Sequence, residues 1–153
     1  MSIKTKFIFS IIITLSAFLY YRIMIDTAPV AIIAIHNNNG FSSVLVRNFP
    51  YSDKKRIKWW LDHKQYLKEN YGIPQSDTQG SFTVIFWDFG DGYKETDGYD
   101  SLCFRDVVLP KNCIDKNALL SVKNGKNSGL EFWVDSGIYR ITQDGYYKMR
   151  KYQ

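Results

Sequence analysis

The chain has 153 residues, of which 45% are apolar, 16% are aromatic and 23% are charged. This composition is enough for one ordinary hydrophobic core but not for two, and it excludes a disordered tail, a collagen-like chain and a disulfide-dense miniprotein. A formal net charge of +5 would ordinarily suggest a nucleic-acid partner. The mean hydropathy of −0.27, however, averages over an apolar N-terminal stretch and a more polar remainder, so the two must be considered separately.

The first stretch is apolar. Residues 7–21 contain no charged side chain, and Ile23, Met24 and Ile25 extend the run beyond Arg22. A helix over residues 7–25 would rise about 28 Å, close to the hydrocarbon thickness of a bilayer, with the guanidinium of Arg22 reaching the far interface. We therefore predict that residues 1–26 form an N-terminal transmembrane helix.

A cleaved signal peptide is the competing interpretation, because Lys4 and Lys6 also form a basic start to the apolar run. Bulky Phe18, Tyr20 and Tyr21 occupy positions where small residues should lead to a cleavage site. The sequence favours an uncleaved anchor, and the alternative stays open at this point.

Basic residues on either side of the apolar run predict its orientation. Lys4, Lys6 and the α-amino group precede the run, whereas Arg22 is the only basic residue close behind it. The positive-inside rule then keeps the N-terminus in the cytoplasm. If the source is a Gram-negative bacterium, we expect a bacterial inner-membrane protein with residues 27–153 in the periplasm. The net charge of that part predicts no nucleic-acid partner.

The next segments predict a hairpin and a helix. Residues 30–35 and 41–49 have strand-like compositions and flank an Asn/Gly turn at residues 37–40. Ser52 is suited to cap a helix over residues 53–71, and Gly72 and Pro74 are suited to end it.

The remainder is rich in predicted strands. They cover residues 81–88, 102–107, 119–123, 130–135, 138–143 and 146–152, with tight turns at Ser136-Gly137 and Asp144-Gly145. Both alternating sets of side chains in residues 81–88 are apolar or aromatic, which is typical of a strand buried on both faces. The predicted fold class is α+β: the transmembrane helix, then an antiparallel β-sheet with one principal helix packed on it.

Cys103 and Cys113 are the only cysteines, and a bond between them would close an 11-residue loop. A redox or metal pair would favour closer spacing and further ligands, so we favour a structural disulfide. A disulfide is also consistent with an exported domain.

The segment from Asp88 to Asp100 is acidic and rich in glycine. Its spacing does not match a calcium-binding EF-hand loop, so a solvated acidic loop is the favoured interpretation and a ligand site using Asp88, Asp91 and Asp97 is the alternative. The sequence predicts no bound metal and no cofactor.

Two further groups are candidate binding residues. Trp59, His63 and Tyr66 share one side of the predicted helix and form either a recognition stripe or the edge of its core face. Lys148, Arg150 and Lys151 could attract an acidic partner or anionic lipid headgroups, or they could protect an edge strand from aggregation. Known motifs for nucleophilic, metallopeptidase or phosphate chemistry are absent, so we predict a protein that is not an enzyme.

Several segments together carry a family resemblance. After the basic start and the apolar anchor come VLVRNFPYSDKKRIKWWLDHKQYLKENYGIP, SFTVIFWDFGDGYKE, LCFRDV and KNCIDKNALLSVKN. This succession resembles the enterobacterial putative membrane protein family, a domain of unknown function. The resemblance covers nearly the whole chain and implies a small single-pass membrane protein, without catalytic residues to transfer.

The sequence therefore predicts a membrane-anchored binding module that engages a protein partner in the envelope through its acidic loop or its helix stripe. An immunity protein that neutralises an envelope-acting toxin is one alternative. An envelope enzyme or ligand-binding protein using the acidic loop is the other.

Overall fold

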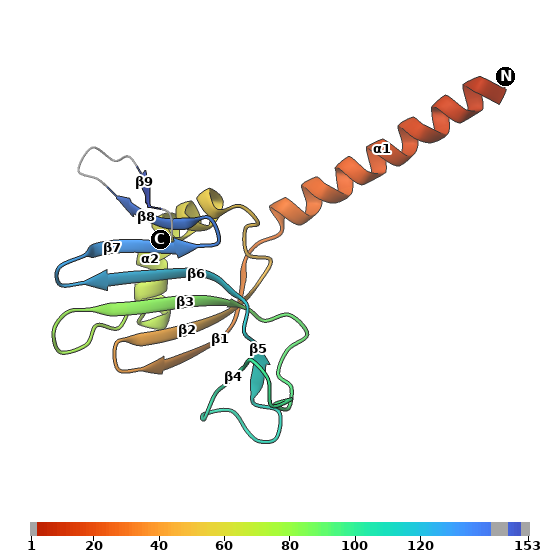
Figure 1. Ribbon diagram of the computed structural model, residues 1–153. Helices are drawn as coiled ribbons and strands as arrows, with labels where there is room; N and C mark the ends of the chain where they lie inside the picture. Colours follow the sequence, from red (N-terminus) through yellow and green to blue (C-terminus); the bar gives the residue numbers. More distant parts are fainter. Residues whose placement is uncertain (1–2, 142–146, 151–153) are drawn as a thin grey trace.

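The computed structural model describes residues 3–141 and 147–150 (Figure 1). Two helices and nine strands are named in the described part. In chain order they are α1 (Ile3–Thr27), β1 (Ala31–Asn38), β2 (Phe41–Arg47), α2 (Asp53–Tyr71), β3 (Phe82–Asp88), β4 (Ser101–Cys103), β5 (Cys113–Asp115), β6 (Ala118–Gly125), β7 (Gly129–Val134), β8 (Gly137–Ile141) and β9 (Tyr147–Arg150).

Helix α1 projects away from the rest of the protein (Figure 1). Its stretch from Thr5 to Met24 is long and apolar enough to cross a bilayer, and none of it is buried by the rest of the chain. An apolar helix with no protein cover needs another apolar surrounding, which a membrane would supply.

The predicted hairpin and helix caps are confirmed. Asn39 and Gly40 both have positive φ angles, 37° and 79°, as a tight turn between twisted strands requires. The hydroxyl of Ser52 accepts a hydrogen bond from the Lys55 N–H, and Gly72 ends α2 in the left-handed conformation.

Seven strands form the main sheet in the order β1-β2-β3-β6-β7-β8-β9, and β4 and β5 form a separate pair. The α+β class is confirmed, but the sheet is mixed rather than wholly antiparallel because β2 and β3 run parallel. The physical reason is α2, which crosses one face of the sheet and returns the chain to the end where β2 began.

The two faces of the sheet are covered differently. Val44, Val46, Val84 and Phe86 point toward α2 and belong to the larger core. The alternating residues Leu45 and Trp87 point the other way, where Phe104 and Ile114 from the β4–β5 region cover them. The prediction that both faces of β3 are buried is thereby confirmed.

The expected strand over residues 102–107 is shorter than predicted. It ends at Cys103, because Phe104 turns into the second core beside Trp87. Its partner β5 was not predicted at all. The Ser136-Gly137 turn links β7 and β8 as expected, whereas Asp144-Gly145 lies outside the described residues.

Candidate functional site

A groove of about 700 Å³ lies between α2 and the start of β1. We call it the juxtamembrane groove because Ala28 and Pro29, which follow α1 directly, line one side of it. Trp59, His63 and Tyr66 line the α2 side, and Tyr51 adds an aromatic side chain.

The predicted helix stripe is part of this groove and of the core edge at the same time. The Trp59 ring packs edge-on against Phe49 and Phe86, at centroid distances of 5.2 and 5.7 Å. His63 stacks on Trp59 at 4.4 Å, and Tyr66 remains half exposed. Core packing therefore fixes the inner side of the stripe and leaves its outer side open in the groove.

The second candidate surface is the acidic lobe, which we define as residues 88–115. It contains seven acidic and three basic residues. Cys103 and Cys113 are directly opposite each other in the β4–β5 pair and are disulfide-bonded, as predicted. The disulfide closes the loop of residues 104–112 at its base, where Phe104 N–H also donates to the Asn112 carbonyl over 2.9 Å.

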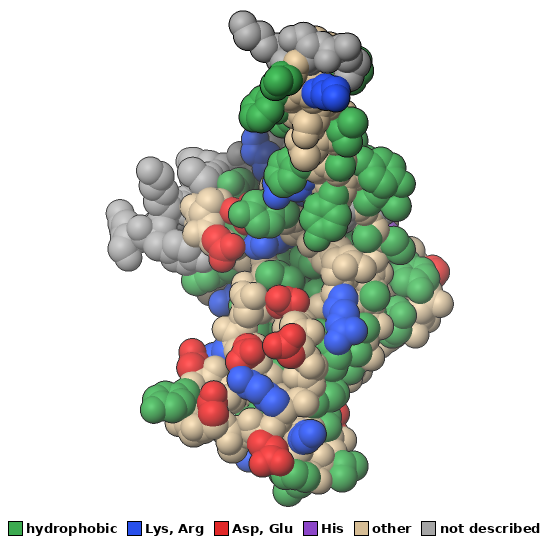
Figure 2. Space-filling model, turned by 90° about the vertical axis from the view of Figure 1, so that its right-hand side faces the viewer, with side chains coloured by type: hydrophobic (Ala, Val, Ile, Leu, Met, Phe, Trp, Pro, Cys, Tyr) green, Lys and Arg blue, Asp and Glu red, His purple; other side chains and the backbone are tan. Residues whose placement is uncertain are grey.

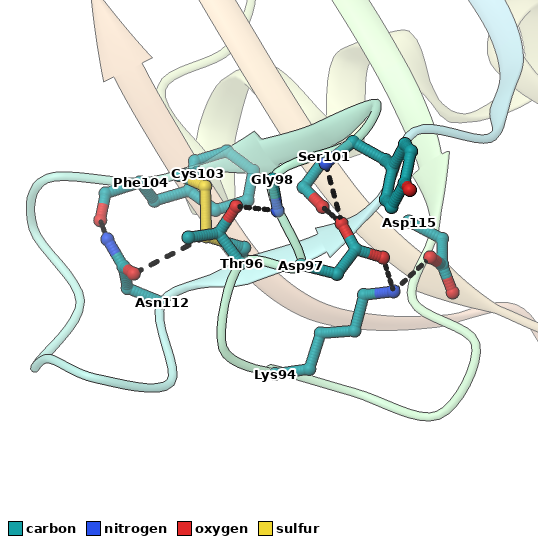
Figure 3. The surroundings of a disulfide bond; sticks show 11 residues. Lys94, Thr96, Asp97, Gly98, Ser101, Cys103, Phe104, Asn112 and Asp115 are labelled. Carbon is teal, nitrogen blue, oxygen red and sulfur yellow. Dashed lines mark hydrogen bonds and ion pairs between the residues drawn. A yellow bond between two sulfur atoms is a disulfide. The ribbon is translucent and has the colours of Figure 1, made fainter.

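Most acidic side chains of the loop take part in local contacts. Figure 3 shows Lys94 between the carboxylates of Asp97 and Asp115. Asp97 also accepts hydrogen bonds from the Tyr99 N–H and the Ser101 hydroxyl, which lower the pKa of its carboxyl. Asp88 accepts a hydrogen bond from the Gly90 N–H over 3.2 Å.

Through these contacts, Asp88 and Asp97 stabilise local turns of the lobe. Asp91 is exposed. Within residues 3–141 and 147–150, no group of three histidine, cysteine, aspartate or glutamate side chains is arranged to hold a metal ion.

The lobe also exposes large apolar side chains. Tyr99, Val108 and Leu109 are 87%, 86% and 74% exposed. Figure 2 shows hydrophobic side chains covering α1 at the top of the view and acidic and basic side chains over the lobe at the bottom. Apolar residues at an exposed loop tip, surrounded by charge, are a feature of protein-binding surfaces.

Sequence reasoning missed a polar contact that holds the lobe on the sheet. His36 on β1 contacts Asp106 through Nδ1 at 2.6 Å and the Tyr93 hydroxyl through Nε2 at 2.8 Å. Its ring stacks on Phe104 with the centroids 3.8 Å apart. The partners lie 70 and 57 positions away, so a local motif could not have revealed them.

This arrangement links β1 to the lobe through both ring nitrogens of His36. A neutral imidazole can donate one hydrogen bond to Asp106 and accept one from Tyr93, so both ring nitrogens are occupied. The hydrogen bond from His36 lowers the pKa of Asp106, whereas burial raises the pKa of Tyr93.

The predicted basic residues fall in the last strand and directly after it. Lys148 and Arg150 fall within β9, whose side chains lie outside the described part of the structure, and Lys151 lies outside the described residues altogether.

The comparison with protein families covers almost the whole chain, since the model of the Enterobacterial putative membrane protein family (DUF943) matches residues 1–152. The chain belongs to this family. No curated protein and no solved structure gives a match. The family description and the apolar helix α1 agree on a membrane protein with one candidate span.

Proposed function

We propose that the chain is a single-pass protein of the bacterial inner membrane whose exported domain binds a protein partner through the acidic lobe. Residues 1–26 are the anchor, with the N-terminus in the cytoplasm, and residues 27–153 are the periplasmic domain. Lys4 and Lys6 before α1 support this orientation. The disulfide supports an oxidising compartment.

The exposed apolar tip of the lobe is the observation that carries the proposal. Val108 and Leu109 lie in a loop that is closed by the disulfide and held down by Phe104, which is buried in the second core. A loop fixed at its base loses less conformational entropy on binding than a free one. The tip can therefore present apolar contacts at low entropic cost.

The charge of the lobe defines the chemistry of the partner. Asp91, Asp97, Asp100 and Asp106 are exposed around a lobe with a formal excess of four negative charges. A complementary partner surface combines an apolar pocket for the tip with basic residues at its rim. A basic toxin delivered to the envelope is one partner of this kind, and in that case the chain is an immunity protein.

Site-specific cross-linking tests the lobe as the binding surface. We expect a photoreactive residue at position 108 in the full-length membrane protein to yield a discrete adduct in cells. The same group at Lys126, on the exposed β6–β7 turn, is the matched control and should not yield that adduct. No adduct at position 108, or the same adducts from both positions, would contradict the proposal.

Thiol labelling tests the topology separately. After mild reduction, Cys103 should react with a membrane-impermeant maleimide in intact spheroplasts, because its side chain is exposed. Labelling that requires lysis of the inner membrane would instead place the domain in the cytoplasm.

A further inference from the structure

With α1 inserted as proposed, one end of the juxtamembrane groove would lie next to the lipid headgroups. The candidate span ends at Met24 and α1 continues to Thr27, so Ala28 is about 6 Å beyond the span along the helix axis. Each headgroup layer is roughly 5–8 Å thick. Because Ala28 itself lines the groove, this end of the groove would lie within the headgroup layer when α1 spans the bilayer.

The side chains of the groove suit that position. Tyr51, Trp59 and Tyr66 combine an aromatic body with a polar atom, which is the chemistry of the aromatic belts at membrane interfaces. Tyr51 is 87% exposed although it adjoins an aromatic groove. Exposed aromatic side chains beside a membrane anchor can enter the interface without any rearrangement of the fold.

The groove and the lobe lie in parts of the chain with opposite net charge. Residues 28–73, which contain α2 and most of the groove, include seven basic and three acidic residues, whereas residues 74–115 include three basic and eight acidic residues. Lys55 lines the groove. An anionic bilayer surface attracts the first of these parts and repels the second.

We propose that the juxtamembrane groove docks on the anionic phospholipid headgroups of the bilayer that holds α1, so that α2 rests against the membrane surface. The inference rests on the proposed insertion of α1 and does not require the protein partner. The stripe of Trp59, His63 and Tyr66 is then a lipid contact, and the lobe on the other face of the sheet remains accessible.

Tryptophan fluorescence can report this docking because all four tryptophans lie outside α1. The full-length protein would be reconstituted in nanodiscs of phosphatidylcholine with phosphatidylglycerol, with and without a nitroxide on the headgroup. We expect the nitroxide to quench the fluorescence. Trp59→Phe should remove most of the quenchable signal, whereas Trp133→Phe on β7 should retain it.

A pair of tyrosines gives a matched control that leaves the core intact. Tyr51 in the groove and Tyr99 in the lobe are equally exposed at 87%. We expect Tyr51→Ser to weaken the quenching severalfold and Tyr99→Ser to leave it unchanged. Replacing phosphatidylglycerol with phosphatidylcholine, or raising the salt concentration, should weaken it as well.

The outcomes separate the two proposals. If the protein does not copurify with the nanodiscs, the anchor itself is wrong and the docking fails with it. If the protein copurifies but is not quenched, or if Tyr51→Ser and Tyr99→Ser behave alike, the docking is wrong and the proposed anchor and partner surface are unaffected.

Discussion

Loss of the Cys103–Cys113 disulfide should lower the stability of the folded domain beyond α1 by a predictable amount. The two cysteines are ten positions apart, and closing an 11-residue loop removes unfolded-state entropy worth about 3 kcal/mol. The proposed domain of residues 27–153 has 127 residues, which corresponds to an unfolding entropy of about 270 cal/mol/K near its melting temperature. Their ratio predicts that the melting temperature falls by about 11 °C.

Thermal unfolding followed by circular dichroism would measure this shift for Cys103→Ala and for the double variant Cys103→Ala/Cys113→Ala. Both variants lack the bond, so both should melt at nearly the same temperature as reduced wild-type protein. Cys113 is almost fully buried. If the double variant melts far below the single one, packing of the Cys113 sulfur contributes stability in addition to loop closure. Reduced and oxidised wild-type protein melting within a degree or so of each other would refute the entropy argument.

Three further predictions concern the core, a buried cation and acid stability. Phe86→Ala should lower the free energy of unfolding, measured with urea, by about 3–5 kcal/mol. The reason is that Phe86 is fully buried against Phe49 and the two tryptophans of α2, Trp59 and Trp60. Arg56→Met should lower the free energy of unfolding by about 2–4 kcal/mol, because buried Arg56 donates hydrogen bonds to the Pro50 and Leu119 carbonyls. The control Lys58→Met, at an exposed ion pair on the same helix, should change that free energy by no more than about 0.5 kcal/mol. Asp106 has a lowered pKa in the folded state, so its contribution is present above about pH 4 and is lost as the pH falls through the folded-state pKa. Asp106→Asn should therefore flatten the acid limb of the stability curve, and an unchanged limb would show that the His36 contact does not contribute.

The local elements could be predicted because their signals are contained in short segments. Ser52 and Gly72 mark the ends of α2 through hydrogen bonds that span only a few residues. Asn39 and Gly40 determine the hairpin turn because they tolerate positive φ angles. Alternation along β3 predicted burial on both faces, although it could not identify which segment covers each face.

The features that were missed depend on residues far apart in the chain. The parallel pairing of β2 and β3 follows from the path of α2 over the sheet, and no turn residue specifies it. The contact of His36 with Asp106 needs the lobe to be folded back over β1. The juxtamembrane groove likewise combines residues next to Ala28 with the outer side of Trp59, which the sequence could only assign to one helix.

The two faces of the sheet separate the two proposed contacts in space. The groove belongs to the face that carries α2, and the acidic lobe packs on the opposite face. Packed layers of secondary structure are about 10 Å apart, so a lobe lying two layers from α2 is roughly 20 Å from the bilayer surface when the groove is docked. A partner that contacts this chain only within the membrane could not reach Val108 and Leu109. Together the two proposals therefore predict that the partner is a periplasmic protein or the extramembrane domain of a membrane protein. An adduct at position 108 with a protein confined to the bilayer would show that the docked orientation is wrong.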